Sequence, residues 1–299
     1  MSSGGRPTDA AFFTVSNDRH FIGAVTLLNS LRRVGHEEPF YLVDCGLTDR
    51  QRDILDGHAT LISAPAHMFP TMLKPYGAVQ VDPEVAVIMD ADVIVVRPLT
   101  DLFGTKPVFF RNDTDRFFTE WLRLGYGRLY PAPYVNAGQM IVPRSSGFLP
   151  RYQSGVERLN EILGDRPPKN WGLANPFYFL DQEVLNALLC SVSPSLYTVS
   201  HEAAYYPFDE PVPNARFLHH ILDKPWLTAR RPNVYTEQMV ELLDSGRVRL
   251  PAEEIPPQMR TGFRGDVARR RSAVQHTVHE HTRGRLGIRP RLAKLGGRR

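Results

Sequence analysis

Two acidic residues, Asp90 and Asp92, lie in the middle of an apolar stretch that spans residues 85–98. Short apolar, β-branched runs of this kind are typical of a buried strand in a parallel sheet. Buried carboxylates are costly without partners, so a hydrogen-bond network or a cation must compensate them. Because alternate residues of a regular strand project to the same side, the pair can chelate one hard divalent ion. The alternative is a strand-end turn in which both carboxylates cap main-chain amides.

The composition is that of a globular protein. The chain has 299 residues, of which 42% are hydrophobic and 23% charged, enough to bury the core of one large domain or two small ones. No window reaches 18 uninterrupted apolar residues, and residues 1–10 lack the apolar core of a signal peptide. Cys45 and Cys190 form neither a disulfide framework nor a zinc-binding spacing. We therefore predict a cytoplasmic protein.

Charge divides the chain into an acidic body and a basic tail. Residues 264–299 hold 11 Lys and Arg and 2 Asp and Glu, whereas the remainder holds 25 basic and 30 acidic residues. We predict a disordered segment at residues 1–9, one domain at residues 10–263 and a separate tail. The tail has three interpretations: a solvated end, a peripheral contact with the anionic inner face of the membrane, or a nucleic-acid contact. Because no aromatic residue interleaves the arginines and the body is acidic, we predict no nucleic-acid partner.

Strand and helix patterns alternate along the first part of the chain. Strands are predicted over residues 10–15, 40–45 and 59–64, with helices beginning at Phe21 and Thr48 between them. This alternation predicts an α/β fold with a doubly wound, mostly parallel sheet flanked by helices. Further strands are predicted over residues 108–111, 135–142, 196–200 and 216–220, and helices over residues 115–124, 147–163, 181–188 and 236–243. The loop after the first strand carries Asn17 and Asp18, which either approach a nucleotide or cap the next helix.

Four features, in the same order along the chain, resemble motifs of the family 8 glycosyltransferases, the family that contains glycogenin and bacterial lipopolysaccharide galactosyltransferases. Residues 87–95 are similar to its Asp-x-Asp strand, and Lys74 lies 16 residues before Asp90, where the family places a donor-binding basic residue. The other matching motifs are Tyr134-Val135-Asn136-Ala137-Gly138, Asp181-Gln182-x-x-Leu185-Asn186, and Phe217-Leu218-His219 followed by Lys224-Pro225-Trp226. The resemblance covers residues 10–226, and the common order of the motifs gives it specificity.

The resemblance implies a GT-A fold and a retaining hexosyltransferase that uses a UDP-sugar donor with a Mn²⁺ or Mg²⁺ ion. The residues that it assigns are Asp90, Asp92 and His219 as metal ligands, Lys224 on the phosphates, Asn17 and Asp18 at the uridine, Lys74, Asn112, Asp113 and Asn136 on sugar and phosphate groups, and Gln182 and Asp181 as catalytic residues. Family members lack a convincing carboxylate nucleophile, so we expect front-face attack with Gln182 lining the β-face of the sugar. The acceptor, a glycan, a lipid-linked sugar or a small molecule, would contact the loops at residues 126–134 and 165–178.

One motif departs from the family pattern. His219 and Lys224 are five residues apart without an intervening glycine, whereas the family usually has six residues and a glycine. The shorter loop brings the phosphate contact of Lys224 into question. His220, which follows the assigned metal ligand, is predicted to be an ordinary core histidine.

Two other functions compete with glycosyl transfer. A non-catalytic sugar-nucleotide-binding or scaffold protein of the same fold would fit the shortened loop. A phosphatase of the haloacid-dehalogenase type also places Asp-x-Asp at a strand end. That class requires the motif on an early strand with Thr or Val two residues later, where this chain has Ile94. The phosphatase is therefore the weaker alternative.

Overall fold

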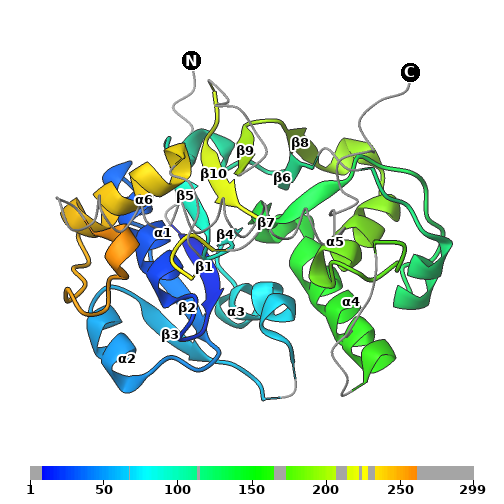
Figure 1. Cartoon of the computed structure of the whole chain (residues 1–299). Helices are drawn as coiled ribbons and strands as arrows, with labels where there is room; N and C mark the ends of the chain where they lie inside the picture. Colours follow the sequence, from blue (N-terminus) through cyan, green and yellow to red (C-terminus); the bar gives the residue numbers. More distant parts are fainter. Residues whose placement is uncertain are drawn as a thin grey trace, which may run out of the picture.

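A computed structural model describes residues 9–66, 68–112, 115–164, 173–206, 214–221, 224–227 and 233–260. Within these ranges the chain forms a seven-stranded sheet, a smaller three-stranded sheet and helices on both faces of the large sheet (Figure 1). The predicted basic tail and all but the last residue of the predicted N-terminal segment lie outside the described residues. No described helix combines the length and apolar character needed to cross a bilayer.

The large sheet has the strand order β3-β2-β1-β4-β7-β6-β8. Its strands are β1 (Ala10–Ser16), β2 (Phe40–Asp44), β3 (Thr60–Ser63), β4 (Val85–Met89), β6 (Val108–Arg111), β7 (Val135–Pro143) and β8 (Thr198–Ser200). β7 runs antiparallel to its neighbours β4 and β6, and the other neighbouring pairs are parallel. The predicted α/β fold with a mostly parallel, doubly wound sheet is therefore confirmed. β4 lies at the centre, which explains why all five of its side chains are buried.

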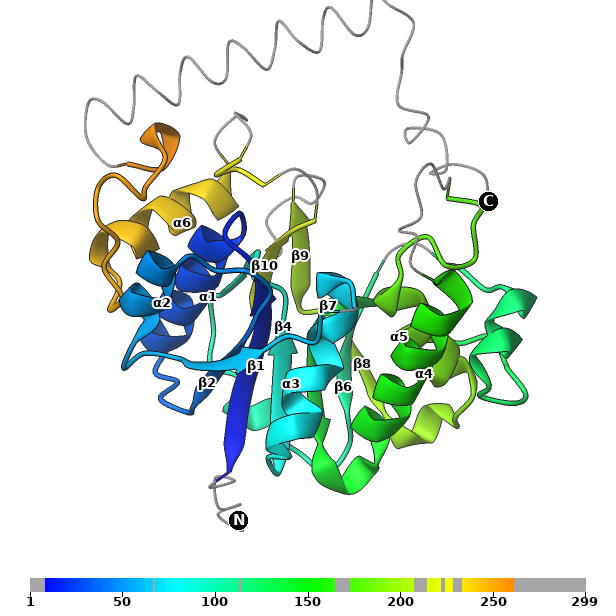
Figure 2. The same cartoon turned by 90° about the horizontal axis from the view of Figure 1, so that it is seen from below.

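Alternation along the strands separates two hydrophobic cores. Phe12 of β1 faces one core and Phe13 the other, as expected for side chains that alternate across a strand. The first core is covered by α1 (Phe21–Arg33) and α6 (Val234–Ser245), and the second by α3 (Lys74–Val81), α4 (Phe148–Leu163) and α5 (Asp181–Cys190). Figure 2 shows these two groups of helices on either side of the strands. The short α2 (Asp49–Leu55) is preceded by its N-cap residue Thr48, whose side chain forms a capping box with Gln51.

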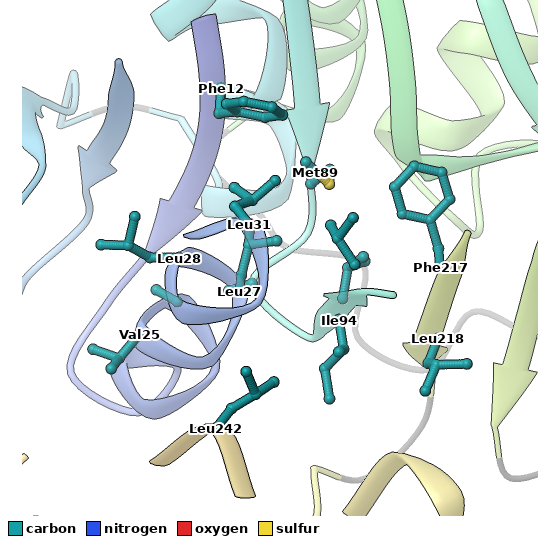
Figure 3. Packing of buried hydrophobic residues seen from close by; sticks show 14 of the residues in the cluster. Phe12, Val25, Leu27, Leu28, Leu31, Met89, Ile94, Phe217, Leu218 and Leu242 are labelled. Carbon is teal, nitrogen blue, oxygen red and sulfur yellow. The ribbon is translucent and has the colours of Figure 1, made fainter. Parts of the chain in front are cut away.

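The small sheet lies against the first core. It has the order β5-β10-β9, formed by β5 (Val93–Val95), β10 (Phe217–His220) and β9 (Ala203–Tyr206). Leu27 of α1, Ile94 of β5 and Leu242 of α6 belong to one buried cluster that joins this sheet to the helices (Figure 3). This packing carries β10 to the end of β4, where the two acidic residues of the Asp-x-Asp motif lie.

The structure corrects three sequence predictions. The single strand predicted around the Asp-x-Asp motif is two strands, β4 and β5, that belong to different sheets and are joined by a turn. The helix predicted over residues 115–124 is a 3₁₀ helix confined to Thr119–Leu124. Two elements, α3 and β9, were not predicted from the sequence. The pattern of α3 is obscured by Pro75 in its first turn and by Gly77 in its interior.

Shorter 3₁₀ turns occur at Pro70–Leu73, Thr100–Leu102, Arg144–Ser146, Pro194–Leu196 and Pro257–Met259.

Candidate functional site

Asp90, Asp92 and His219 meet where the two sheets adjoin. Each offers an oxygen or nitrogen atom, and these three atoms lie within 4.8 Å of one another. Nε2 of His219 is 3.2 Å from Oδ1 of Asp92 and 3.7 Å from Oδ2 of Asp90. The turn between β4 and β5 brings the carboxylates together, so a continuous strand is not required. Two carboxylates and an imidazole form a donor set that suits Mn²⁺ or Mg²⁺.

The Lys224 side chain adds a positive charge next to Asp92. The Lys224 ammonium is ion-paired with Asp92 and also donates to the carbonyl oxygen of His220 at 2.8 Å. Burial alone would raise the pKa of Asp92, but Lys224 and His219 outweigh it and hold that pKa well below its usual range. Asp92 is therefore ionised at neutral pH despite being buried.

The Lys74 ammonium links the cluster to α5. Its Nζ lies 2.7 Å from Oδ1 of Asp90 and 3.0 Å from Oδ2 of Asp181, and it donates to the carbonyl oxygen of Ala137 at 3.3 Å. Burial would lower the pKa of Lys74, but Asp181 and Asp90 outweigh it and raise that pKa. Burial also raises the pKa of Asp181 to about 6, against the opposing effect of Lys74. Lys74 thus stays charged while it holds two carboxyl groups from different elements.

Gly138 and Gln139 of β7 shape the space around the His219 ring. A Cβ at Gly138 would lie 2.4 Å from Cε1 of His219 and 2.7 Å from Oδ2 of Asp90, so only glycine leaves this space open. The Nε2 of Gln139 lies 2.9 Å from Nδ1 of His219, and Oε1 of the same amide has no hydrogen-bond partner in the described part of the chain. If the Gln139 amide is turned over, its Oε1 accepts the proton on Nδ1 of His219. The lone pair on Nε2 of His219 is then available to a cation. The residues present therefore fit a divalent ion.

Gln182, at the start of α5, is held by hydrogen bonds to β7 and to Tyr134, the residue that precedes β7. Its Oε1 accepts a hydrogen bond from the main-chain nitrogen of Ala137 at 3.2 Å, and its Nε2 donates to the Tyr134 hydroxyl at 3.1 Å. Oδ1 of Asn136 accepts from the main-chain nitrogen of Gly138 at 2.6 Å. The motifs around residues 134–138 and 181–186 therefore form one hydrogen-bonded unit next to the metal-ligand candidates.

The remaining predicted residues lie at strand ends. Asn17 follows β1, and its Oδ1 accepts from the main-chain nitrogen of His20 at 3.2 Å, so it serves the loop before α1. Asp18 is exposed and accepts from the main-chain nitrogen of Arg19 at 2.8 Å. Asn112 follows β6 and donates from its main-chain nitrogen to the carbonyl oxygen of Tyr134. Asp113 lies outside the described residues.

The neighbours of His219 and Lys224 belong to the core. His220 is fully buried with its ring edge-on to Tyr235, as predicted for a packing residue. Trp226 donates its indole N–H to the carbonyl oxygen of Arg19 at 2.8 Å and packs where a Cβ at Gly23 would fall. Trp226 thus ties the segment of Lys224 to the loop after β1.

Sequence reasoning missed several residues that support the site. Gln139 had a detectable signal, since it and Asn136 are the two polar side chains in the otherwise apolar strand β7. Tyr152 had none, although its hydroxyl lies 3.3 Å from Oδ2 of Asp181. The ion pair between Arg116 and Glu183, whose Arg116 Nη2 and Glu183 Oε1 are 2.9 Å apart, also joins distant positions that the sequence does not relate.

Solved structures of glycosyltransferases share this architecture. The galactosyltransferase LgtC in complex with donor and acceptor sugar analogs matches with a TM-score of 0.55 and 15% identity, over 81% of this chain and 98% of that chain. An active-site mutant of LgtC gives a TM-score of 0.57 at 14% identity, over 81% and 98%. The glycosyltransferase GlyE of Streptococcus pneumoniae TIGR4 gives 0.51 at 18% identity, over 79% of this chain and 60% of GlyE. No family model matches the sequence, and no curated protein does so either.

These likenesses establish the fold. The chain has the GT-A fold that the resemblance to the family 8 glycosyltransferases implies, and that prediction is confirmed. The identities are too low to carry function across from the neighbours. A functional conclusion must therefore rest on the chemistry of the site.

Proposed function

We propose that this protein is a metal-dependent, retaining glycosyltransferase that moves a hexose from a UDP-sugar to an acceptor hydroxyl. The observation that carries the proposal is the convergence of Asp90, Asp92 and His219 within 4.8 Å on the GT-A fold. The donor nucleotide, the ion, the sugar and the stereochemical course are all part of this proposal. So is the cytoplasmic location predicted from the sequence.

The first step in the proposal is donor binding. Asp90, Asp92 and His219 would hold Mn²⁺ or Mg²⁺, which supplies positive charge to the diphosphate as the glycosidic bond breaks. Lys224, an ammonium without fixed fork geometry, would exchange its contact with Asp92 for a phosphate oxygen. Asn17 and Asp18 at the end of β1 would contact the uridine.

The second step is sugar transfer near α5. Lys74, Asn112, Asp113 and Asn136 would bind sugar and phosphate groups, as predicted. Gln182 has both amide atoms engaged, which suits a residue that lines the β-face of the sugar and orients it. Asp181 is paired with Lys74 and would hold a sugar hydroxyl instead of attacking the anomeric carbon. This arrangement supports front-face attack by the acceptor over a two-carboxylate double displacement.

The acceptor and a membrane contact belong to the least constrained part of the proposal. The predicted acceptor loop at residues 165–178 is described only from residue 173 onward. A membrane role for the basic tail concerns residues outside the described ranges. Co-sedimentation with anionic liposomes tests it: a truncation at Gly262 should lose the binding that the full chain shows.

A non-catalytic sugar-nucleotide-binding protein is the second candidate. The observation that favours it is the occupation of both carboxylates by ammonium groups, Asp92 by Lys224 and Asp90 by Lys74. In such a protein the lysines would take the place of an ion. The two candidates therefore differ in whether Mn²⁺ strengthens donor binding and in whether the sugar is transferred.

A thermal-shift screen of UDP-, GDP-, ADP- and TDP-sugars, each with and without Mn²⁺, tests the proposal. A ligand at 100 times its Kd stabilises the native state by about 2.7 kcal/mol. A bound donor should therefore raise the midpoint temperature of thermal unfolding measurably. We expect a shift only for a UDP-sugar with Mn²⁺, together with release of UDP during turnover. An unfolding midpoint that rises equally with and without Mn²⁺, in the absence of UDP release, would favour the non-catalytic binding protein. No shift with any nucleotide sugar would contradict both.

A further inference from the structure

The turn that leads into α5 has an unusual backbone. Leu180 has φ 50° and ψ −112°, the values of the first central position of a type II′ turn, which glycine normally occupies. The main-chain nitrogen of Gln182 donates to the carbonyl oxygen of Phe179 at 3.1 Å, which closes this turn. A leucine in this conformation is strained, and it persists only where surrounding contacts determine it.

Arg116 supplies contacts on both sides of the strained residue. Before the turn, its guanidinium donates to the carbonyl oxygens of Leu173 at 2.8 Å and Asn175 at 3.0 Å. After the turn, its Nη2 lies 2.9 Å from Oε1 of Glu183. The two side chains of this ion pair are 7% and 0% exposed, so water screens their attraction little.

Aromatic rings hold the guanidinium in place between these partners. Its central carbon lies 4.9 Å from the ring centroid of Phe118 and 5.1 Å from that of Phe179, the first residue of the turn. A guanidinium held between aromatic rings combines cation–π attraction with several hydrogen-bond donors in fixed directions, which lysine does not reproduce. Arg116 therefore contacts the start of the turn, the segment before it and the helix after it.

The clamped turn determines where two predicted site residues lie. Asp181 and Gln182 directly follow Leu180, and they make the contacts with Lys74 and with β7 described above. A relaxed Leu180 with negative φ would change the direction in which the first turn of α5 leaves the loop. Both side chains would then lose their positions relative to the metal-ligand candidates.

We propose that Arg116 is a positioning residue that holds the strained turn at Leu180 and thereby aims Asp181 and Gln182 at the sugar. The effect on the turn stands on the contacts alone. The effect on turnover rests on the proposed function.

Hydrogen exchange and donor hydrolysis together test this role. We expect Arg116→Met and Arg116→Lys to increase amide exchange at residues 177–186 about tenfold, since neither side chain can place a guanidinium over both rings while donating to both carbonyl oxygens. With UDP-glucose and UDP-galactose as probes in Mn²⁺, kcat should fall roughly 100-fold while the donor KM changes by less than about 3-fold. Arg247→Met removes an exposed Arg–Glu ion pair and serves as the matched control. Unchanged exchange at residues 177–186 in both Arg116 variants would overturn the proposal.

A second substitution separates a positioning role from general support of the fold. Glycine accepts the conformation of Leu180 without strain, so Leu180→Gly should restore part of the slow exchange and of kcat in the Arg116→Met background. Leu196→Gly, at a leucine without positive φ, should restore neither. Faster exchange in the Leu180→Gly double variant than in Arg116→Met alone would contradict the clamp. If the wild type binds and hydrolyses neither probe, the proposed function fails, and the exchange data still decide whether Arg116 holds the turn.

Discussion

Buried carboxyl groups occur both at the junction of the two sheets and at the start of α5, and their pKa values are shifted in opposite directions. At the junction of the two sheets, Lys224 and His219 lower the pKa of Asp92 despite its burial. At the start of α5, burial dominates and raises the pKa of Asp181 to about 6 and that of Glu183 to about 7, although Lys74 and Arg116 oppose it. Burial alone therefore does not set the charge of a carboxyl. The number and closeness of its cations decide.

The difference fits the two ends of a nucleotide sugar. The junction of the sheets keeps the Asp92 carboxylate negatively charged, which would hold a divalent cation, and the cation would in turn attract the negatively charged diphosphate. The start of α5 carries the Gln182 amide and the Asp181 carboxyl of raised pKa, groups that can hydrogen-bond the neutral hydroxyls of a sugar. Lys74 contacts both sides, because its ammonium lies between Asp90 and Asp181.

The largest expected effect is on turnover at the sheet junction. Asp92→Asn removes a candidate metal ligand and the charged partner of Lys224, and we expect metal-dependent turnover to fall roughly 1,000-fold or more, because charge stabilisation of the leaving group would be lost. The measurement is UDP release in Mn²⁺, with circular dichroism to check the fold. Asp49→Asn, at an almost fully exposed side chain, is the matched control. Wild-type turnover in the Asp92 variant would remove the metal assignment.

The link between the two sides should carry much of the local stability. Lys74→Met leaves Asp90 and Asp181 without their shared cation, and breaking a buried pair in this way costs roughly 3–5 kcal/mol of unfolding free energy. Urea denaturation measures it, with Lys106→Met at an exposed position as the control. Adding Asp181→Asn should recover part of the loss, since one uncompensated carboxylate is removed. A loss below about 1 kcal/mol, the range of a surface ion pair, would show that Lys74 does not join the two sides.

The opposite pKa directions predict opposite pH dependences. The pKa of Asp181 is raised from 3.8 to about 6, so its contribution to stability is present below about pH 4 and is lost as the pH rises through 6. Relative to Asp181→Asn, the wild type should lose about 2 kcal/mol of unfolding free energy between pH 4 and pH 7.

The pKa of Asp92 is lowered, so its contribution has the opposite sign: it is present above the unfolded pKa and is lost as the pH falls further. Urea denaturation in EDTA, with each variant measured beside the wild type, compares the two. If the difference in unfolding free energy from the wild type changed with pH in the same direction for Asp92→Asn and Asp181→Asn, the two carboxyl groups would not have oppositely shifted pKa values.

The smallest predicted effect concerns the orientation of His219. Gln139→Leu removes the amide next to Nδ1, and loss of such a contact behind a metal-binding histidine typically weakens affinity 10- to 100-fold. Titration calorimetry with Mn²⁺ alone measures this without an assay of activity. Gln153→Leu, at a buried glutamine of α4 whose amide donates to Glu157, should leave the affinity unchanged. Equal affinities of the wild type and Gln139→Leu would show that the amide does not orient the ring.

The metal-ligand candidates could be predicted from sequence because their motifs are local and chemically restricted. Much of the order of strands and helices could also be predicted, since β4 is a continuous apolar run and α2 begins with a capping box, whereas α3, β5 and β9 were not recognised. The turn at Asp90–Ala91–Asp92 could not, because both flanking strands are buried and the apolar pattern continues through it. A strand that changes sheets has the same sequence pattern as one that does not.

The contacts that support the candidate site from outside could not be predicted from the sequence for a different reason. Arg116 and Glu183 are 67 positions apart, and nothing in either local sequence indicates the other. Leu180 has a backbone conformation that sequence rules reserve for glycine, so those rules predict a different turn. Such exceptions depend on tertiary contacts, which only the folded chain shows.

The central claim is that Asp90, Asp92 and His219 hold a divalent ion that binds the diphosphate of a UDP-sugar. Anomalous diffraction at the manganese edge from crystals grown with Mn²⁺ and UDP tests it most directly. We expect one strong anomalous peak bounded by these three side chains, with UDP phosphate oxygens on its open side. UDP bound at the site with no manganese peak, and Lys224 still on Asp92, would contradict the claim.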